Sequence, residues 1–148
     1  MADPALGVRA YLLAQSSITA IVGSSTSARF YPEVLPQNAI LPAVSYETIS
    51  DLPDHCIGAE WGRCGYSQAR IAFDCYAATA AASKNLARTI MSVVSGPTAR
   101  LRGVYGGVNF LDVMIDQGSR TEQDPPNDGS DERRYLTTIE LMVSYYDE

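Results

Sequence analysis

The residues with the most chemical potential in this chain are one histidine and three cysteines. His55 and Cys56 are adjacent, while seven residues separate Cys56 from Cys64 and ten separate Cys64 from Cys75. Structural zinc sites usually take ligands in close pairs such as C-x₂-C, because a short turn points both sulfurs at the metal. These gaps are wider, and Cys75 falls on the apolar side of a predicted strand. The spacing therefore favours isolated structural thiols over a Cys₃His zinc site.

A cysteine nucleophile would need a base, and His55 is the only histidine. Adjacency in sequence is not the arrangement of a catalytic pair, because the fold brings nucleophile and base together. We interpret His55 as a polar loop residue. The N-terminus also lacks the basic and apolar regions of a secretory signal, so reduced thiols made in a cytoplasm are expected.

Carboxylates are the other candidates for chemistry. Asp112 and Asp116 lie before a polar segment that contains Asp128, Asp131 and Glu132. A hydrolase needs a general acid and base in environments that separate their pKa values, and nothing distinguishes two of these acids in that way. Solvated charge or contacts to neighbouring subunits explain them better. Residues 103–107 lack the Lys-Ser/Thr ending and following helix of a phosphate loop. We therefore predict no catalytic residue, no cofactor, no metal and no enzymatic activity.

Charge and composition narrow the class of protein further. The chain has 148 residues, a net charge of −6, and 11 basic against 17 acidic residues. Tight binding of nucleic acid depends on Lys and Arg neutralising phosphates, so a DNA reader is disfavoured. A surface past which DNA slides without sticking would suit this balance. No run of about 18 apolar residues occurs, so no membrane span is expected.

Tyrosine is abundant, with nine residues in the chain. Tyr105, Tyr135, Tyr145 and Tyr146 fall in or beside predicted strands of the C-terminal half. Tyrosine is enriched at protein interfaces because its ring buries area while its hydroxyl finds a partner. Ordinary packing within a sheet is the alternative for each of them.

The stretch from Tyr66 to Gly96 organises the rest of the chain. It alternates in polarity at first, which predicts a strand with one apolar face, made of Ala69, Ile71, Phe73, Cys75 and Ala77. After Thr79 the apolar residues recur at helical steps, at Ala82, Leu86, Ile90 and Val93. Gly96 in a left-handed conformation and Pro97 are expected to end this helix. A strand that leads into an amphipathic helix forms half of a helix-on-sheet layer.

Other segments complete the predicted layout. Asp3 and Pro4 suit a helix start, with Leu6, Ala10 and Leu13 on its apolar face and Val8, Tyr11 and Leu12 widening it. A short helix over 17–22, a flexible loop at 24–27, and strands at 28–31 and 43–50 follow. Pro42 indicates an edge or entry position for the second of these strands. Residues 51–65 are expected to be irregular.

The C-terminal half predicts further strands. Residues 101–117 indicate a strand pair or one interrupted strand, and residues 108–115 are apolar enough to be covered on both faces. Residues 118–133 predict a long exposed loop or the tip of a long hairpin. The last strand, 135–146, has Tyr135, Thr137, Ile139, Leu141, Val143 and Tyr145 on one side. Residues 1–148 thus form one α+β domain with a mainly antiparallel sheet packed against helices.

An ordered set of segments resembles the tail completion or tail-to-head joining proteins of long-tailed bacteriophages, the tail terminators. The resemblance covers residues 6–95 and, more loosely, 133–147. In the N-terminal part it rests on residues 8–12 with 18–23, which correspond to the family's opening helical segment, and on Arg29-Phe30-Tyr31-Pro32. Residues 35–39, 41–46 and 49–50 continue the match, followed by His55 and Gly58. The last matching segments are the predicted strand 70–77 and Leu86-Ala87 in the helix after it. Ala72 replaces a common Gln, residues 24–27 lengthen a loop, and 100–133 match weakly.

This resemblance implies a structural virion protein rather than an enzyme. Such proteins assemble in the bacterial host cytoplasm, usually as a hexameric ring at the head-proximal end of the tail tube. The ring stops tube growth, meets the head completion or stopper protein, and lets DNA pass through its lumen without sequence-specific binding. The sheet edge and residues 118–133 are then expected to contact neighbouring subunits, the tube protein or the connector.

Other readings stay open at this stage. Another ring of the neck, such as the stopper, or the tail tube protein itself would share most of these features. A small thiol-dependent enzyme and a monomeric ligand-binding domain belong to different classes. Function after replacement of all three cysteines would exclude the enzyme, and stable rings would count against the monomer.

Overall fold

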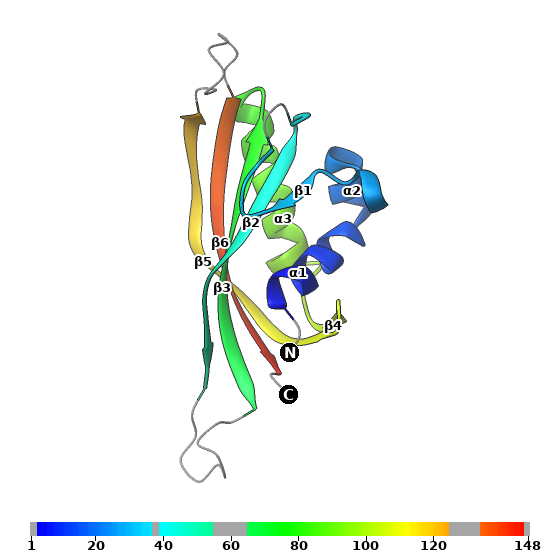
Figure 1. Ribbon diagram of the computed structural model, residues 1–148, viewed down its shortest axis with the longest axis vertical. Coiled ribbons are helices and arrows are strands. Elements are labelled where there is room, and N and C mark those ends of the chain that lie inside the picture. The colour runs from blue at the N-terminus through cyan, green and yellow to red at the C-terminus, as the bar shows by residue number, and fades with distance from the viewer. Residues whose placement is uncertain (1–2, 37–38, 55–64, 125–133, 147–148) are drawn as a thin grey trace.

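The computed structural model describes residues 3–36, 39–54, 65–124 and 134–146. They form one α+β domain in which helices pack against one face of a long, twisted sheet (Figure 1). The predicted fold class is therefore confirmed. His55, Cys56, Gly58, Trp61, Cys64, Asp128, Asp131 and Glu132 lie outside the described residues.

The sheet has six strands in the order β1-β2-β3-β6-β5-β4. β1 runs parallel to β2, and every other neighbouring pair is antiparallel. The strands span Phe30–Pro32 (β1), Ala43–Pro53 (β2), Tyr66–Ala77 (β3), Gly103–Tyr105 (β4), Val108–Asp124 (β5) and Arg134–Tyr146 (β6).

β3 is the central strand, and its apolar side is the middle of the core. The five residues predicted for that side are all buried, and the ring of Phe73 has no exposed area. Phe73 packs near the rings of Phe30 and Tyr46, with centroids 6.4 and 6.2 Å away. Strict alternation along β3 and β6 thus turns one face of the sheet toward the helices.

The helix α3 (Ala80–Ser95) covers that face, and its start and end occur where predicted. The Thr79 hydroxyl accepts a hydrogen bond from the Ala82 N–H at 3.2 Å and caps the helix. Leu86, Ile90 and Val93 are buried, but the expectation for Ala82 was wrong because it is exposed. Near the helix start the buried position is taken by Ser83.

The reason given for Gly96 also needs correction. Its φ is −98°, which is not left-handed. A Cβ there would lie 2.0 Å from the Ser92 carbonyl oxygen, so glycine is needed for close approach rather than for a special φ.

The first helix, α1 (Pro4–Leu13), begins at Asp3, whose carboxylate accepts from the Ala5 N–H at 2.9 Å. Its buried face is Pro4, Ala5, Gly7, Val8, Tyr11 and Leu12. The predicted face of Leu6, Ala10 and Leu13 was therefore wrong, and Leu6 is 52% exposed. Gly7 shifts the face, because its bare backbone lies against Phe110 and Tyr105.

The helix α2 (Ser16–Val22) ends at Gly23, and a 3₁₀ turn at Ser25–Ser27 follows where only a loop was expected. No single helix in the described residues is long and apolar enough to cross a membrane. The pair α1 and α2 passes that test only when taken together, and it is bent by 92°. Their apolar residues Val8, Leu12, Ile18 and Val22 belong to the core.

Two strands are longer than predicted. β2 continues to Pro53, so residues 51–53 are strand rather than irregular chain. β5 continues to Asp124 and pairs with β6 down to Asp124 and Arg134. Residues 118–124 are therefore part of a long hairpin and not an exposed loop, because the strand pairing continues past the bulges at 115–120. The strand pair expected within 101–117 is confirmed as β4 and the start of β5.

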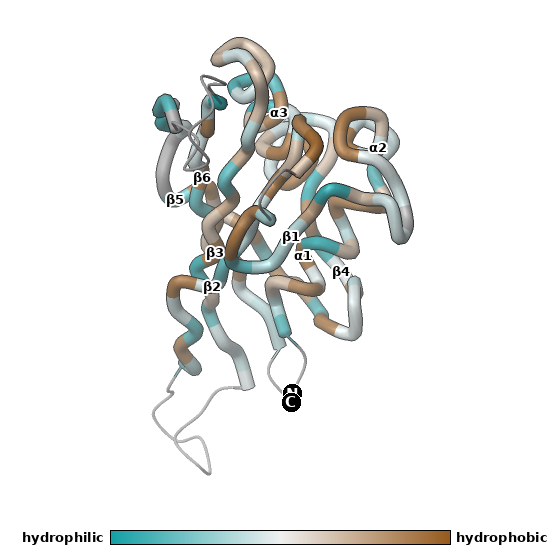
Figure 2. The backbone as a smooth tube through the Cα atoms, turned by 45° about the horizontal axis from the view of Figure 1, so that its top comes forward, coloured by the Kyte–Doolittle hydropathy of each residue, from teal (hydrophilic) through white to brown (hydrophobic). Residues whose placement is uncertain are grey.

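The prediction that the start of β5 is covered on both faces was wrong. Residues 108–115 were expected to be covered on both faces, yet only Val108, Phe110 and Val113 are buried. Met114 is 59% exposed and Ile115 is 36% exposed. The helices cover one face only, so Met114 on the other face remains at the surface, while Ile115 pairs with Leu141 on the helix side and is incompletely covered there. Figure 2 marks hydrophobic residues in brown along the helices and the strands alike.

Phe73→Ala should lower the free energy of unfolding by about 3–5 kcal/mol, since it removes a fully buried ring at the centre of the core. Urea denaturation followed by circular dichroism measures this. Leu6→Ala, at an exposed helix position, is the control and should change stability by less than about 0.5 kcal/mol. A small loss for Phe73→Ala would contradict the central place of β3.

Gly7→Ala should destabilise the protein although alanine is the better helix former by about 1 kcal/mol. The added Cβ would lie 2.7 Å from the Phe110 ring and 2.9 Å from the Tyr105 carbonyl oxygen. Overpacking of this kind costs about 1–3 kcal/mol, so a net loss of stability is expected. Asn85→Ala on the exposed side of α3 should instead be neutral or stabilising in the same melting assay.

Candidate interaction surface on the open face of the sheet

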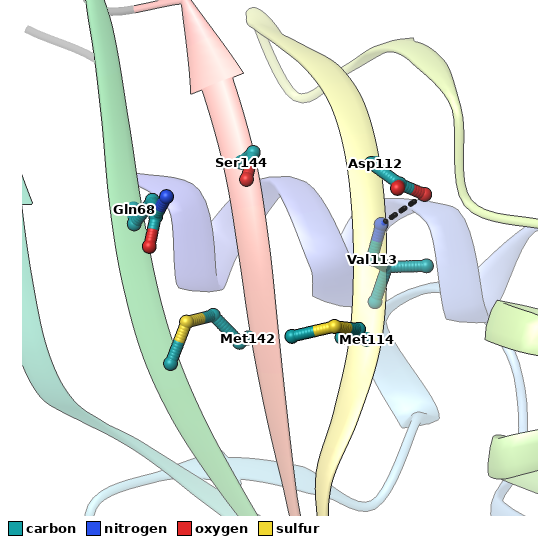
Figure 3. Close-up of a pocket in the computed structure, with 6 residues that line it drawn as sticks. All are labelled: Gln68, Asp112, Val113, Met114, Met142 and Ser144. Carbon is teal, nitrogen blue, oxygen red and sulfur yellow. Dashed lines mark hydrogen bonds between the residues drawn. The ribbon is translucent and has the colours of Figure 1, made fainter. Parts of the chain in front are cut away.

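The face of the sheet that points away from the helices is open to solvent, and we call it the open face. Its residues alternate with the buried ones along β3 and β6, and the pairing register aligns them across the strands. The close-up in Figure 3 looks onto this face, with the helices behind the strands. The open face is therefore built by the same alternation that builds the core.

Two methionines lie side by side on the open face. Met114 of β5 and Met142 of β6 are register partners; in Figure 3 the Met114 side chain extends toward β6, and the Met142 side chain extends in the same direction toward β3. With Gln68, Asp112, Val113 and Ser144 they line a hollow of about 80 Å³. This hollow is shallow and holds little more than a side chain. Flexible thioethers at a surface suit contact with another protein.

Charged residues surround the methionines and are partly paired with one another. Arg70 binds Asp116 at 2.8 Å, and the Thr138 hydroxyl donates to the Asp74 carboxylate at 2.7 Å. Asp112 accepts from the Val113 N–H at 2.9 Å and binds Arg100. The Val113 hydrogen bond, then Arg100, lower the pKa of Asp112, so it stays ionised.

The open face is acidic overall in the described residues. It carries the carboxylates of Glu47, Asp74, Asp112, Asp116, Glu122 and Glu140, against the guanidinium groups of Arg70, Arg120 and Arg134.

The helix layer has the opposite charge. α1, α2 and α3 contain no acidic residue, and their charged residues are Arg9, Lys84 and Arg88. In the sequence, residues 4–32 and 75–111 have no Asp or Glu, although the chain has 17 of them. These segments without acidic residues can be seen in the sequence, and they indicate that one side of the domain is less acidic than the other. The two sides of the slab thus differ in sign.

The sheet also has unpaired backbone along both of its lateral edges. β1 pairs only with residues 44–46 of β2, and β4 pairs only with residues 108–110 of β5. Beyond those short partners, the outer edges of β2 and β5 have no strand beside them in the described chain. Exposed apolar residues lie on the same two strands, at Ile49, Leu52, Met114 and Ile115. Such edges readily accept another chain.

The predicted chemical residues do not come together as a site. Cys75 is buried, and burial raises the pKa of its thiol strongly. This thiol is therefore inert as a nucleophile in the folded protein. Asp112 and Asp116 are on the open face and form ion pairs with separate arginines. No group of three His, Cys, Asp or Glu that could hold a metal occurs in the described residues.

The tyrosines divide between packing and surface. Tyr145 is buried, and its hydroxyl donates to both oxygens of the Asp51 carboxylate, at 2.7 and 2.8 Å. Tyr105 packs edge-on against Tyr11, with centroids 4.8 Å apart. Tyr146 is 38% exposed and contacts the ring of Tyr66. Sheet packing thus explains Tyr105 and Tyr145.

Comparisons with known proteins give structural likenesses but no match by sequence. No family of proteins matches the sequence, and no curated protein matches it. Among solved structures, a chain described as "Virion of native gene transfer agent (GTA) particle" is similar over 97% of this chain and 95% of that one. The TM-score is 0.55 and the identity 14%. The likeness supports the α+β fold over the whole domain and, by itself, nothing finer.

Cys75 should resist alkylation until the protein unfolds. In a Cys56→Ser/Cys64→Ser variant it is the only thiol, so iodoacetamide labelling followed by mass spectrometry reports on it alone. We expect no labelling at pH 8 in buffer and full labelling in denaturant, since the buried thiol has a raised pKa. Rapid labelling of the native protein would contradict this expectation and favour the hypothesis of a thiol-dependent enzyme.

Proposed function

We propose that this chain is a structural protein of a phage-like virion that forms a ring at the head-proximal end of the tail tube. There it ends tube growth and joins the tail to the head connector. The observation that carries the proposal is the likeness to a virion chain over nearly the full length of both chains. The ordered segments that resemble tail terminators point to the more specific role within such a particle.

The surface of the domain supports assembly rather than catalysis. Two unpaired strand edges and a broad open face with exposed methionines are available to neighbouring subunits, the tube protein or the connector. The pocket on the open face is too small and shallow to enclose a substrate. A ring of identical subunits would cover the edges by giving each one a partner.

The acidic balance supports passage of DNA through such a ring. With a net charge of −6, the chain has too few free cations to retain a polyanion. DNA would move through the lumen without being held, and no sequence would be read.

Deletion of the gene from its particle-producing genome tests this proposal directly. We expect DNA-filled heads lying apart from tails, and tubes of irregular length, in electron micrographs of the lysate. Supplying the wild-type chain from a plasmid is the control and should restore joined particles. Normal particles without the chain would overturn the proposal.

The same micrographs separate this role from its neighbours in the particle. Loss of all tubes would indicate the tube protein, and tails of normal length that fail only to join heads would indicate the stopper ring. Either result would keep a structural virion protein and change its place.

A further inference from the structure

We propose that copies of this chain associate through opposite faces, with the basic outer side of α3 from one copy seated on the acidic open face of the next. This inference rests on the proposed ring and names the contact between its subunits. The partner is a second copy because one chain carries both complementary surfaces.

The outer side of α3 is basic, and most of its exposed side chains are short. Its exposed residues follow a helical stripe of Ala81, Lys84, Asn85, Arg88 and Ser92. The short side chains let another surface approach closely, while Lys84 and Arg88 stand one helical turn apart. The structure gives neither cation an ion-pair partner within the described chain.

The open face offers a matching pair of carboxylates. Glu47 of β2 and Glu140 of β6 are the register partners of Ala72 on either side of β3. Ala72 is small, so the row between the two acids is low. Neither Glu47 nor Glu140 has an ion pair in the part of the chain that the structure describes, unlike Asp112 and Asp116. Of the open-face acids without an ion pair in the described residues, Asp74 accepts a hydrogen bond from Thr138, and Glu47 and Glu140 are left to be neutralised by a neighbour.

The spacings of the two pairs differ by only a few ångströms, which long side chains can bridge. Two strands that flank a third are about 10 Å apart, which separates the backbones of Glu47 and Glu140. Four residues of helix rise about 6 Å, which separates Lys84 from Arg88. Long lysine and arginine side chains span the difference. An α3 that crosses the strands over Ala72 would therefore place each cation against one carboxylate.

Such a contact uses two different patches of the same subunit, so it is head-to-tail. Contacts of this type close into rings when the rotation between subunits is a fraction of a full turn. Exposed Met114 and half-buried Met142 lie on the same open face, two residues along the strands from the Ala72 row, and would give the contact an apolar part.

Charge reversal on each face tests the inference. Self-association of the wild-type chain is measured by sedimentation velocity and native mass spectrometry at low salt. The variants Lys84→Glu/Arg88→Glu and Glu47→Lys/Glu140→Lys should each weaken association at least about 10-fold, because like charges then face each other across the contact. Their melting curves must match the wild type, which excludes loss of fold.

Mixing the two variants is the decisive measurement. In the mixture, the unchanged acidic open face of the Lys84→Glu/Arg88→Glu variant meets the unchanged basic α3 of the Glu47→Lys/Glu140→Lys variant. The basic open face of the second variant likewise meets the acidic α3 of the first. We expect association to return only in the mixture, as alternating complexes with even numbers of subunits. Glu33→Lys, at an exposed site outside both surfaces, is the control and should associate like the wild type.

Three outcomes would overturn the contact: wild-type association that neither variant changes, a mixture that stays dissociated, or a wild-type chain that stays monomeric at high concentration. None of these would touch the proposed place in the virion, which the gene deletion tests separately. Separated heads and tails together with a failed mixing experiment would keep the function and discard this interface.

Discussion

The structure depends on one constraint, which is that the sheet has a single face to bury. Five alternate residues of β3 and four of β6 form one continuous apolar surface, and α1, α2 and α3 supply enough apolar area to cover it once. Burial of such surface is the main favourable term in folding, at about 25 cal/mol per Å². With no helix left for the second face, that face must be polar or be covered by another molecule. The open face shows both features.

Two sets of polar side chains in the described core tie its elements together. The hydroxyl of Thr137 lies 3.0 Å from that of Thr121 and donates to Ser83 at 3.0 Å, so β5, β6 and α3 are linked at one point. At the other end of the sheet, Tyr145 of β6 is tied to Asp51 of β2. Buried polar groups that find partners favour one arrangement of the elements over alternatives. The long hairpin is thereby held to the helix beneath it.

Local patterns predicted this fold where packing follows the sequence period. The strand 66–77, the helix that starts after Thr79 and the last strand all showed alternation or helical spacing that matches their buried sides. Prediction failed where a distant residue decides. The buried face of α1 depends on Phe110 and Tyr105, about a hundred positions away, and no pattern within residues 4–13 shows that. The length of β5 depends on pairing with β6, which overrides the polar composition of residues 118–124.

The candidate surface was less visible in the sequence for a related reason. Exposed acids and methionines look like ordinary solvated positions when read one at a time. They form a surface only because the register of β3, β5 and β6 brings Arg70, Met142 and Met114 into one row. The segments without Asp or Glu were the one sequence feature that indicated the charge difference between the two sides, since they contain the helices that cover the sheet.

The close approach of α1 to the β4–β5 turn also has a consequence for how the chain folds. Gly7 lies against Phe110, and the Tyr11 hydroxyl donates to the Val93 carbonyl oxygen, 82 residues later. α1 therefore cannot dock fully until residues 93–110 have been made. Contacts of such long sequence separation slow folding, because a large loop must close before they form. During synthesis α1 would stay with its apolar side uncovered until these later residues have left the ribosome.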